Sequence, residues 1–219
     1  MRHLIVDLES LAIDDADTYL EPVSAPANYK DPEKIAAYQA EARQGQLDKA
    51  ALDIDLARIV ALGMLGEHDE KPQVLLAPAP GDEAALLLSF WATWAVKGRP
   101  TLVTYNGLGF DLPLLLRRSL YLNVAAPHIQ VDRFKHPQVI DLMQVLSYDG
   151  KLKFRGLGFY ANRFNIQTDD DISGKDIAAA VRAGNWDAVQ RHCASDVLTT
   201  RALGRRMGLL GQAQPEMVA

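Results

Sequence analysis

The order of strand-like and helix-like segments limits the folds open to this 219-residue chain more than any single motif does. Residues 3–8 alternate in character and predict a first strand, and residues 58–65 and 73–77 predict two more, joined by a short polar hairpin. Three sequential strands of this kind form an antiparallel meander. After a helix expected at 82–96, a short buried strand at 101–105 can join the sheet in parallel by a crossover. The pattern therefore predicts an α/β protein built on a mixed sheet.

The rest of the chain predicts helices and one insertion. Residues 14–52 interrupt the strand pattern, and within them Asp31 and Pro32 predict the N-cap and first residue of a helix that runs to about Arg43. Asn185 predicts the N-cap of the last helix. After a turn at 106–109, helices are expected up to about 121 and at 141–146, 157–164, 175–183 and 186–207.

The sequence shows no internal repeat and no linker rich in proline, glycine or serine. We therefore expect a single domain over residues 1–219, with the insertion at about 14–52 and a loose tail at about 211–219. The insertion is compatible with a lid or with a dimer contact, and its sequence does not separate these two roles.

The composition is that of a soluble globular protein, with 48% hydrophobic and 23% charged residues. No apolar run approaches the ~18 residues that a membrane-spanning helix needs. The first residues reach Asp7 and Glu9 at once, which does not fit the apolar region of a signal peptide. The single cysteine, Cys193, excludes an internal disulfide and fits a reducing compartment. We therefore expect a cytoplasmic protein.

The net charge of −5 is unusual for a protein that binds nucleic acid, but it is unevenly distributed. Between Pro113 and Arg163 the chain has eight basic and three acidic residues, a net +5 that leaves −10 for the remainder. Charge separated in this way can present a basic surface while the whole molecule stays acidic. An ordinary mixed surface is the alternative.

Two carboxylates stand two residues apart on the first expected strand. Asp7 and Glu9 share one face of that strand, a few ångströms apart, while Leu4, Val6 and Leu8 form an apolar row on the other face. One interpretation is that the pair has a functional role. The alternative is an edge strand with an acidic face turned to solvent.

A turn with two glycines follows the strand expected at 101–105. The stretch 105–111 (YNGLGFD) ends that strand and begins a helix, and ligand sites gather at the carboxyl ends of such strands. Asp111 falls at the helix start, where the alternative is that it only caps the helix. The glycines do not match a dinucleotide fingerprint, which needs a third glycine and an acidic partner.

A third group of polar residues lies near the C-terminus. His192 and Asp196 are four residues apart and share one face of the last expected helix. The alternative is an ion pair on a helix surface.

The three groups, in this order along the chain, resemble the DEDD superfamily of 3′-5′ exonucleases. The resemblance spans about residues 4–204 and is nearest to predicted stand-alone exonucleases related to the proofreading domain of family B DNA polymerases. Three local stretches support it: 29–35 (YKDPEKI), 139–143 (VIDLM) and 196–198 (DVL). The resemblance implies a ribonuclease H-like mixed sheet, with three antiparallel strands plus parallel strands, flanked by helices.

The resemblance also implies that four carboxylates bind metal: Asp7, Glu9, Asp111 and Asp196. Carboxylates that converge repel one another by about 4 kcal/mol per pair at ~4 Å and an effective dielectric constant of ~20, so such a cluster binds cations or retains protons. Hard oxygen ligands suit Mg²⁺ or Mn²⁺, and two ions roughly 3.5–4 Å apart serve an in-line displacement at phosphorus. By the resemblance, Asp7 contacts both ions and Asp111 mainly the second. Glu9 and Asp196 serve mainly the first.

His192 departs from the superfamily pattern. One subtype has a tyrosine four residues before the last aspartate, and the other has a histidine five residues before it. Here a histidine stands at the tyrosine spacing. Because residues i and i+4 of a helix project together, we expect His192 to reach the attacking water and, with a reference pKa near 6.5, to accept its proton. A side chain can also occupy this position without acting as a base.

Residues beside the motifs are candidates for substrate contacts. By the resemblance, Ser10 and Leu11 line the terminal nucleotide, and Asn106 and Phe110 flank the second motif. Phe110 can instead be an ordinary core residue.

The basic segment 133–155 can follow the phosphates of a nucleic acid, with Phe134 or Tyr148 stacking on bases. A solvated loop is the alternative for this segment.

The resemblance therefore implies a metal-dependent enzyme that removes 5′-mononucleotides from the 3′ end of single-stranded DNA. An exonuclease for RNA or short oligoribonucleotides is the alternative that keeps the same site, and a catalytically silent nucleic-acid-binding module is the alternative that is not an enzyme. A polymerase or a repair protein is compatible as a partner in trans. No membrane contact is expected, and no motif indicates an oligomeric state.

Overall fold

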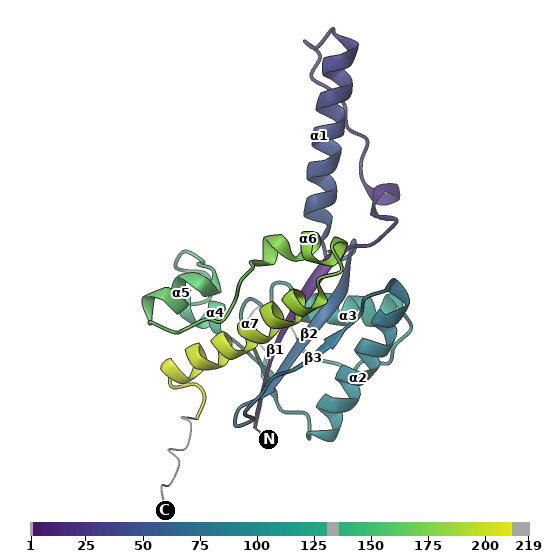
Figure 1. Cartoon of the computed structure of the whole chain (residues 1–219). Helices are drawn as coiled ribbons and strands as arrows, with labels where there is room; N and C mark the ends of the chain where they lie inside the picture. The colour runs from purple at the N-terminus through teal and green to yellow at the C-terminus, as the bar shows by residue number, and fades with distance from the viewer. Residues whose placement is uncertain (1, 131–135, 212–219) are drawn as a thin grey trace, which may run out of the picture.

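A mixed five-stranded sheet forms the centre of the protein in the computed structural model, which describes residues 2–130 and 136–211 (Figure 1). The strands lie in the order β3-β2-β1-β4-β5. Their bounds are β1 His3–Ala12, β2 Ala57–Gly66, β3 Gln73–Leu76, β4 Thr101–Thr104 and β5 Val139–Asp141. β1, β2 and β3 pair antiparallel, whereas β4 pairs parallel to β1 and β5 pairs parallel to β4. The predicted meander, hairpin and parallel crossover strand are confirmed.

β1 lies in the middle of the sheet, between β2 and β4. The alternative of an edge strand with an acidic solvent face is therefore wrong for Asp7 and Glu9. Leu4, Val6 and Leu8 pack into one core cluster, and Ile5 belongs to a second cluster on the other face. Helices thus cover both faces of β1, and the acidic face looks into the protein.

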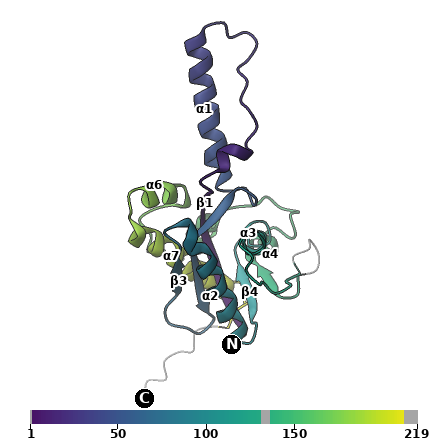
Figure 2. The same cartoon turned by 90° about the vertical axis from the view of Figure 1, so that its right-hand side faces the viewer.

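Two layers of helices enclose the sheet. Their bounds are α1 Pro32–Ala50, α2 Glu83–Val96, α3 Asp111–Tyr121, α4 Leu142–Leu146, α5 Leu157–Arg163, α6 Ile177–Arg182 and α7 Trp186–Arg206. α2 and α3 cover one face, and α7 crosses the other face together with α4, α5 and α6 (Figures 1 and 2). No helix among the described residues is long and apolar enough to cross a membrane.

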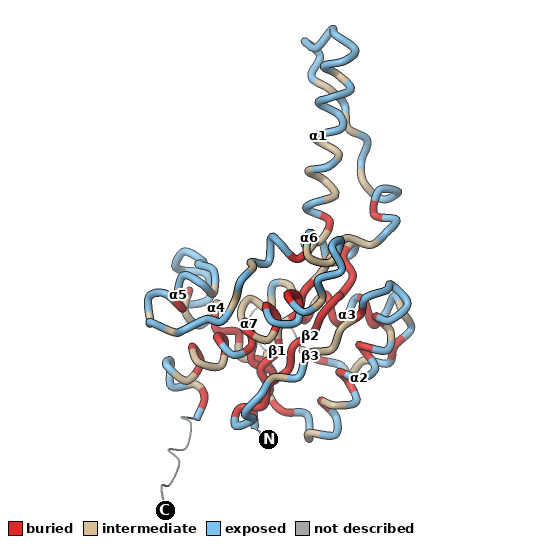
Figure 3. The backbone as a smooth tube through the Cα atoms, in the orientation of Figure 1, coloured by how far each residue is buried: buried red, intermediate tan, exposed pale blue. Residues whose placement is uncertain are grey.

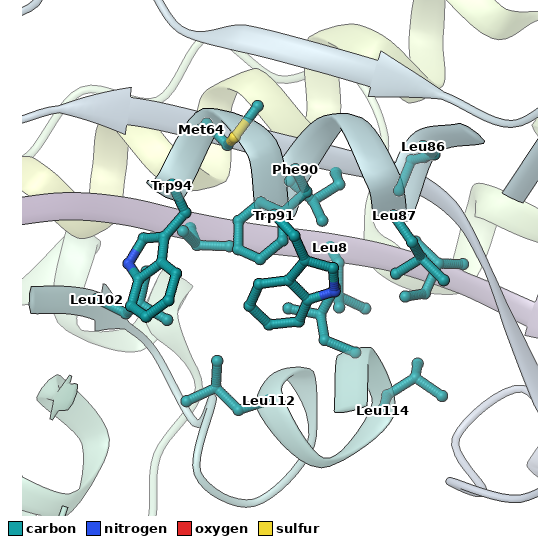
Figure 4. Close-up of a cluster of buried hydrophobic side chains, with 14 of the residues drawn as sticks. Leu8, Met64, Leu86, Leu87, Phe90, Trp91, Trp94, Leu102, Leu112 and Leu114 are labelled. Carbon is teal, nitrogen blue, oxygen red and sulfur yellow. The ribbon is translucent and has the colours of Figure 1, made fainter. Parts of the chain in front are cut away.

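The larger core lies under α2, where aromatic side chains fill the space between the helix and the sheet (Figure 4). The indole nitrogens are paired, because Trp91 Nε1 donates to Ser119 Oγ at 2.9 Å and Trp94 Nε1 donates to the Pro100 carbonyl at 2.9 Å. Buried polar groups of this kind are stable only when they are hydrogen-bonded. These two bonds therefore hold α2 to α3 and to the chain before β4.

A buried ion pair joins three elements of the same layer. Arg118 of α3 donates to both carboxylate oxygens of Glu83, at 2.9 and 2.7 Å. Glu83 Oε1 also accepts the backbone N–H of Ile59 in β2 at 2.8 Å. The Glu83 carboxylate thus ties α2, α3 and β2 together with its charge compensated.

The predicted helix starts at Asp31 and Asn185 are confirmed, but α1 is longer than predicted and one strand was missed. Asp31 Oδ1 accepts the Glu33 N–H at 3.0 Å, and Asn185 Oδ1 accepts the Ala188 N–H at 3.2 Å, as N-caps do. α1 continues to Ala50 rather than ending near Arg43. β5 was not predicted, because three residues are too few to show an alternating pattern.

Residues 14–52 form an arm that stands away from the sheet, with α1 exposed along most of its length (Figure 3). Arg43 fixes the return segment by donating to Asp17 Oδ1 at 2.6 Å and to the Glu21 carbonyl at 3.1 Å. At the base of the arm, Ser10 Oγ donates to the Ala51 carbonyl at 2.6 Å. The arm therefore begins directly after the acidic part of β1.

The last described residue, Gly211, contacts the β2–β3 hairpin. The Gly211 N–H donates to Glu67 Oε1 at 2.6 Å, and Glu67 Oε2 lies 2.8 Å from His3 Nδ1. Of the tail expected at 211–219, residues 212–219 lie outside the described residues.

The buried ion pair generates a stability prediction. Replacing Glu83 by Ala leaves the Arg118 charge buried and unpaired, so the free energy of unfolding should fall by about 3–5 kcal/mol in urea denaturation. The matched control is Asp55→Ala, which breaks the exposed pair with Arg117 and should change stability by about 1 kcal/mol or less. Equal effects of the two variants would contradict this account of the core.

Candidate active site

Three elements that are far apart in the sequence bring the predicted acidic residues together. β1 carries Asp7 and Glu9, and α3 begins at Asp111. α7 carries His192 and Asp196, and ligand atoms of Glu9, His192 and Asp196 lie within 4.8 Å of one another. The charges of Asp111, Glu9 and Asp196 all act on the Asp7 carboxylate. We call Asp7, Glu9, Asp111 and Asp196 the carboxylate cluster.

The close approach of α7 to the sheet depends on a glycine in β2. A Cβ atom at Gly63 would lie 3.0 Å from Cys193 Sγ and 3.0 Å from Val197 Cγ1. These two residues directly follow His192 and Asp196 on α7. A side chain at position 63 would therefore force the Cys193 and Val197 side chains, and α7 with them, to shift by a few tenths of an ångström relative to the sheet.

Asp111 does not cap α3. The N-cap position is Phe110, and no side-chain hydrogen bond caps the helix there. The alternative reading of Asp111 as only a helix cap is therefore wrong. Its side chain is buried, and backbone N–H groups of Asp111 and Leu8 favour its charged form, which places the carboxylate beside β1.

The turn before Asp111 is held by a residue that the motif analysis did not assign to the site. Asp141, at the end of β5, accepts the backbone N–H groups of Asn106 and Leu108, each at 3.0 Å. It also caps α4 by accepting the Met143 N–H at 2.9 Å. Because both carboxylate oxygens are used, Asp141 positions the turn that presents Asp111.

The turn itself is tight. Asn106 has a φ of 65°, and a Cβ at Gly107 would lie 2.4 Å from the Thr104 side chain. Glycine is therefore required at position 107 for the chain to reverse between β4 and α3.

His192 lies inside the site rather than on the surface. Its Nε2 is 3.5 Å from Glu9 Oε1 and 3.9 Å from Asp196 Oδ2, and its side chain is only 7% exposed. The alternative of an ion pair on a helix surface is therefore wrong. The histidine at the tyrosine spacing does reach the carboxylate cluster.

Asp170 is a second residue that the sequence analysis missed. Its Oδ2 lies 2.5 Å from His192 Nδ1, so the hydrogen-bond network assigns the ring proton to Nδ1. In the neutral ring, Nε2 is then the acceptor nitrogen, and it faces Glu9 and Asp196. The only signal in the sequence is the acidic run 169–171, which carries no helical or strand periodicity.

Burial and mutual repulsion raise the pKa values of the carboxylate cluster. Burial raises the pKa of Asp7 and of Glu9 well above the usual range, and neighbouring carboxylates raise both further. Burial also raises the pKa of Asp111 to about 7, and it raises the pKa of Asp196 despite the opposing effect of His192. The charged form of the cluster therefore needs a compensating cation.

The donor set fits a hard divalent cation. Four carboxylates supply the oxygen ligands that such ions prefer, and Asp7 and Asp196 keep part of their surface open to solvent. Cys193 Sγ is close to Asp7 and Glu9, but burial raises the pKa of this thiol, which keeps it protonated and a poor ligand. The acidic residues could thus bind metal through oxygen.

The four residues predicted to contact substrate lie in four different environments. The Ser10 hydroxyl is engaged with the base of the arm, and Leu11 packs against the core cluster beside α6 and α7. The Asn106 backbone binds Asp141, and Phe110 packs against the core under α2, which supports the alternative of a core residue. Arg133 and Phe134 lie outside the described residues.

Two of the cavities that the described residues form lie outside the carboxylate cluster. The larger, of about 390 Å³, lies between α2 and residues 125–127, on the other side of the sheet. The smaller, of about 210 Å³, borders α7 and is lined by Asp169, Arg191 and Ser195, which are sequence neighbours of site residues.

Comparison with known families gives one match. Residues 49–214 match the family described as "Predicted 3'-5' exonuclease related to the exonuclease domain of PolB". Asp111, His192 and Asp196 lie inside the matched region, whereas Asp7 and Glu9 precede it. No curated protein matches the chain.

A solved structure has the same fold. The family B DNA polymerase from the hyperthermophilic archaeon Pyrobaculum calidifontis superposes with a TM-score of 0.61 at 17% sequence identity. The match covers 94% of this chain and 24% of the polymerase, so the chain spans about a quarter of that protein. The predicted ribonuclease H-like fold is confirmed.

The raised pKa of Asp111 generates a pH prediction for the metal-free protein. Between its ordinary value of 3.8 and the folded value of about 7, Asp111 binds more protons when folded than when unfolded. The free energy of unfolding should therefore rise as the pH falls through this interval. When wild type and Asp111→Asn are denatured in the presence of a chelator, the free energy of unfolding of the variant should depend less on pH than that of wild type.

The same experiment with Mn²⁺ provides the control. Mn²⁺ should raise the unfolding temperature of the wild type near pH 8, because a ligand of the folded state stabilises it by mass action. An Asp111→Asn variant with unchanged pH dependence and an unchanged Mn²⁺ response would remove Asp111 from the cluster.

Proposed function

Because the chain belongs to the family of predicted 3′-5′ exonucleases related to the exonuclease domain of PolB, we propose that it hydrolyses phosphodiester bonds from the 3′ end of single-stranded DNA. The observation that carries this proposal is the convergence of Glu9, His192 and Asp196 from β1 and α7 within 4.8 Å. The products are 5′-mononucleotides and a shortened strand. We further propose that residues 1–219 act as one exonuclease domain.

The carboxylate cluster would hold two Mg²⁺ or Mn²⁺ ions. Such ions neutralise charge at the scissile phosphate and lower the pKa of water. The chain itself supplies the ligands on rigid elements, since β1 is the central strand and α7 packs directly on Gly63. Rigid placement matters because small displacements of reacting groups cost large factors in rate.

His192 is the proposed general base. Its Nε2 accepts a proton from the attacking water as the water oxygen bonds to phosphorus and the bond from phosphorus to the 3′ oxygen breaks. The 3′ oxygen takes up a proton from solvent. Asp170 is a positioning residue, because its carboxylate holds the Nδ1 proton and keeps Nε2 directed toward Glu9 and Asp196.

Two alternatives share the acidic site. An RNA exonuclease would use the same groups and differ in contacts to the 2′-hydroxyl. A silent nucleic-acid-binding module has no reason to gather four mutually repelling carboxylates, so the raised pKa values of Asp7 and Glu9 favour an enzyme.

The activity prediction uses a 5′-labelled single-stranded oligonucleotide with Mg²⁺ or Mn²⁺. Wild type should produce a ladder that shortens from the 3′ end, and Asp7→Asn should produce none, because a ligand to both ions is lost. Asp14→Asn, an exposed acid on the arm, is the matched control and should behave as wild type. A wild type without laddering, or an active Asp7→Asn variant, would refute the function. Matched RNA substrates decide between the two exonuclease classes.

The proposed base generates a second prediction. With Mn²⁺ at saturating concentration, so that the carboxylates stay charged across the pH range tested, His192→Ala should lower kcat by ~10²–10⁴-fold and remove the acidic limb of the pH–rate profile. His128→Ala, an exposed histidine after α3, should leave both unchanged. A preserved acidic limb in His192→Ala would exclude the histidine as the base.

The role of Asp170 is tested by asking whether the effect of its substitution depends on His192. Asp170→Asn should lower kcat with little change in KM, and it should have no further effect in the His192→Ala background. Asp171→Asn alters an exposed neighbouring acid and should leave kcat unchanged. Independent, multiplicative losses in the double variant would contradict a role for Asp170 through His192.

A further inference from the structure

Large apolar side chains lie exposed on the segment between α4 and α5. Tyr148 is 66% exposed, Leu152 55% and Phe154 48%, and Phe159 on α5 is 43% exposed. Exposed apolar side chains are common singly, but several within one short segment indicate a binding surface. We call Tyr148, Leu152, Phe154 and Phe159 the aromatic patch.

Basic residues alternate with the members of the aromatic patch. Lys151, Lys153 and Arg155 flank Leu152 and Phe154 in the sequence, and all three basic side chains are exposed. None of the three takes part in an ion pair with another described residue. The guanidinium of Arg155 lies 4.9 Å above the Phe159 ring, so one cation is already ordered against an aromatic side chain. The surface is locally positive on a protein whose net charge is −5.

The segment that carries the patch is anchored beside the proposed active site. The Tyr105 hydroxyl donates to the Arg155 carbonyl, and Tyr105 directly precedes the turn that presents Asp111. Tyr160 of α5 packs in the same cluster as Val197, the neighbour of Asp196 on α7. Figure 1 shows α4 and α5 beside α7, in the layer that carries His192. A strand whose 3′ end occupies the carboxylate cluster can therefore continue across this segment.

We propose that the aromatic patch and its lysines bind the nucleotides upstream of the 3′ end of a single-stranded polynucleotide. A single strand offers base faces and phosphates in alternation, and the segment offers aromatic rings and cations in alternation. Rings stack on bases without sequence preference, and lysines neutralise phosphates. This inference rests on the proposed exonuclease function for the position of the 3′ end, and it predicts an enzyme that prefers longer strands.

The test measures the binding of 5′-fluorescein oligothymidylates of about 3 and about 15 nucleotides by fluorescence anisotropy, in a chelator so that no substrate is cut. Wild type should bind the long strand more tightly than the short one. Phe154→Ala combined with Phe159→Ala removes two stacking rings and should weaken binding of the long strand by roughly 30-fold or more. Binding of the short strand should stay unchanged.

The lysines are tested by the salt dependence of binding. Lys151→Gln combined with Lys153→Gln should make the slope of log affinity against log salt shallower by about 1.4, as expected for two single-strand phosphate contacts. Lys71→Gln and Leu88→Ala replace exposed residues that belong to other parts of the surface and should change neither affinity nor slope. Unfolding temperatures verify that each variant is folded. Tyr148→Ser tests the most exposed ring of the patch by a single substitution, in the same binding measurement.

The outcomes separate this inference from the proposed function. Unchanged affinity and slope in the patch variants, or equal losses for short and long strands, overturn the inference even if wild type cuts DNA. If wild type cuts no oligonucleotide but the patch variants lose affinity for the long strand, the binding surface stands and the exonuclease function fails.

Discussion

Repulsion among closely placed carboxylates is the interaction on which the rest of this protein depends. Asp7 and Glu9 sit on the central strand, where helices cover both faces, and α7 brings Asp196 against them. Desolvation and like charge both raise the pKa values of these groups, so the arrangement opposes folding unless protons or cations compensate it. The apolar clusters on the two faces of the sheet must supply the stability that holds the acids in place. The folded protein therefore needs positive charge, from protons or cations, at the carboxylate cluster.

Hydrogen bonds from residues outside the three predicted motifs fix the positions of the side chains in the site. Asp141 holds the turn before Asp111 through backbone N–H groups, and Asp170 holds the ring of His192. Neither residue belongs to the carboxylate cluster, but Asp141 fixes the turn before one of its members and Asp170 fixes the histidine beside it. A histidine at the tyrosine spacing reaches Glu9 because residues four apart on α7 share a face and because Gly63 lets the helix approach. Glycine at position 63 and carboxylates at positions 141 and 170 thus contribute to the geometry of the site together with the motif residues.

Much of the fold was predictable because its signals are local. Alternation marked β1, polar residues marked the hairpin between β2 and β3, and Asp31 and Asn185 marked helix starts by side-chain bonds to nearby backbone. The acids of the site were predictable by their order along the chain. Asp141 and Asp170 were not, because their partners lie 35 and 22 residues away and no periodicity encodes such contacts. β5 was missed because a three-residue strand exists only through its pairing with β4.

The central claim is that the carboxylate cluster binds two divalent cations at the 3′ end of a nucleic acid. Crystals grown with Mn²⁺ and a 5′-mononucleotide, measured at the manganese absorption edge, test it most directly. The account predicts two anomalous peaks among Asp7, Glu9, Asp111 and Asp196, with the nucleotide phosphate beside them and His192 Nε2 facing that phosphate. Well-ordered carboxylates with no anomalous peak between them, at Mn²⁺ concentrations that support any activity, would contradict it.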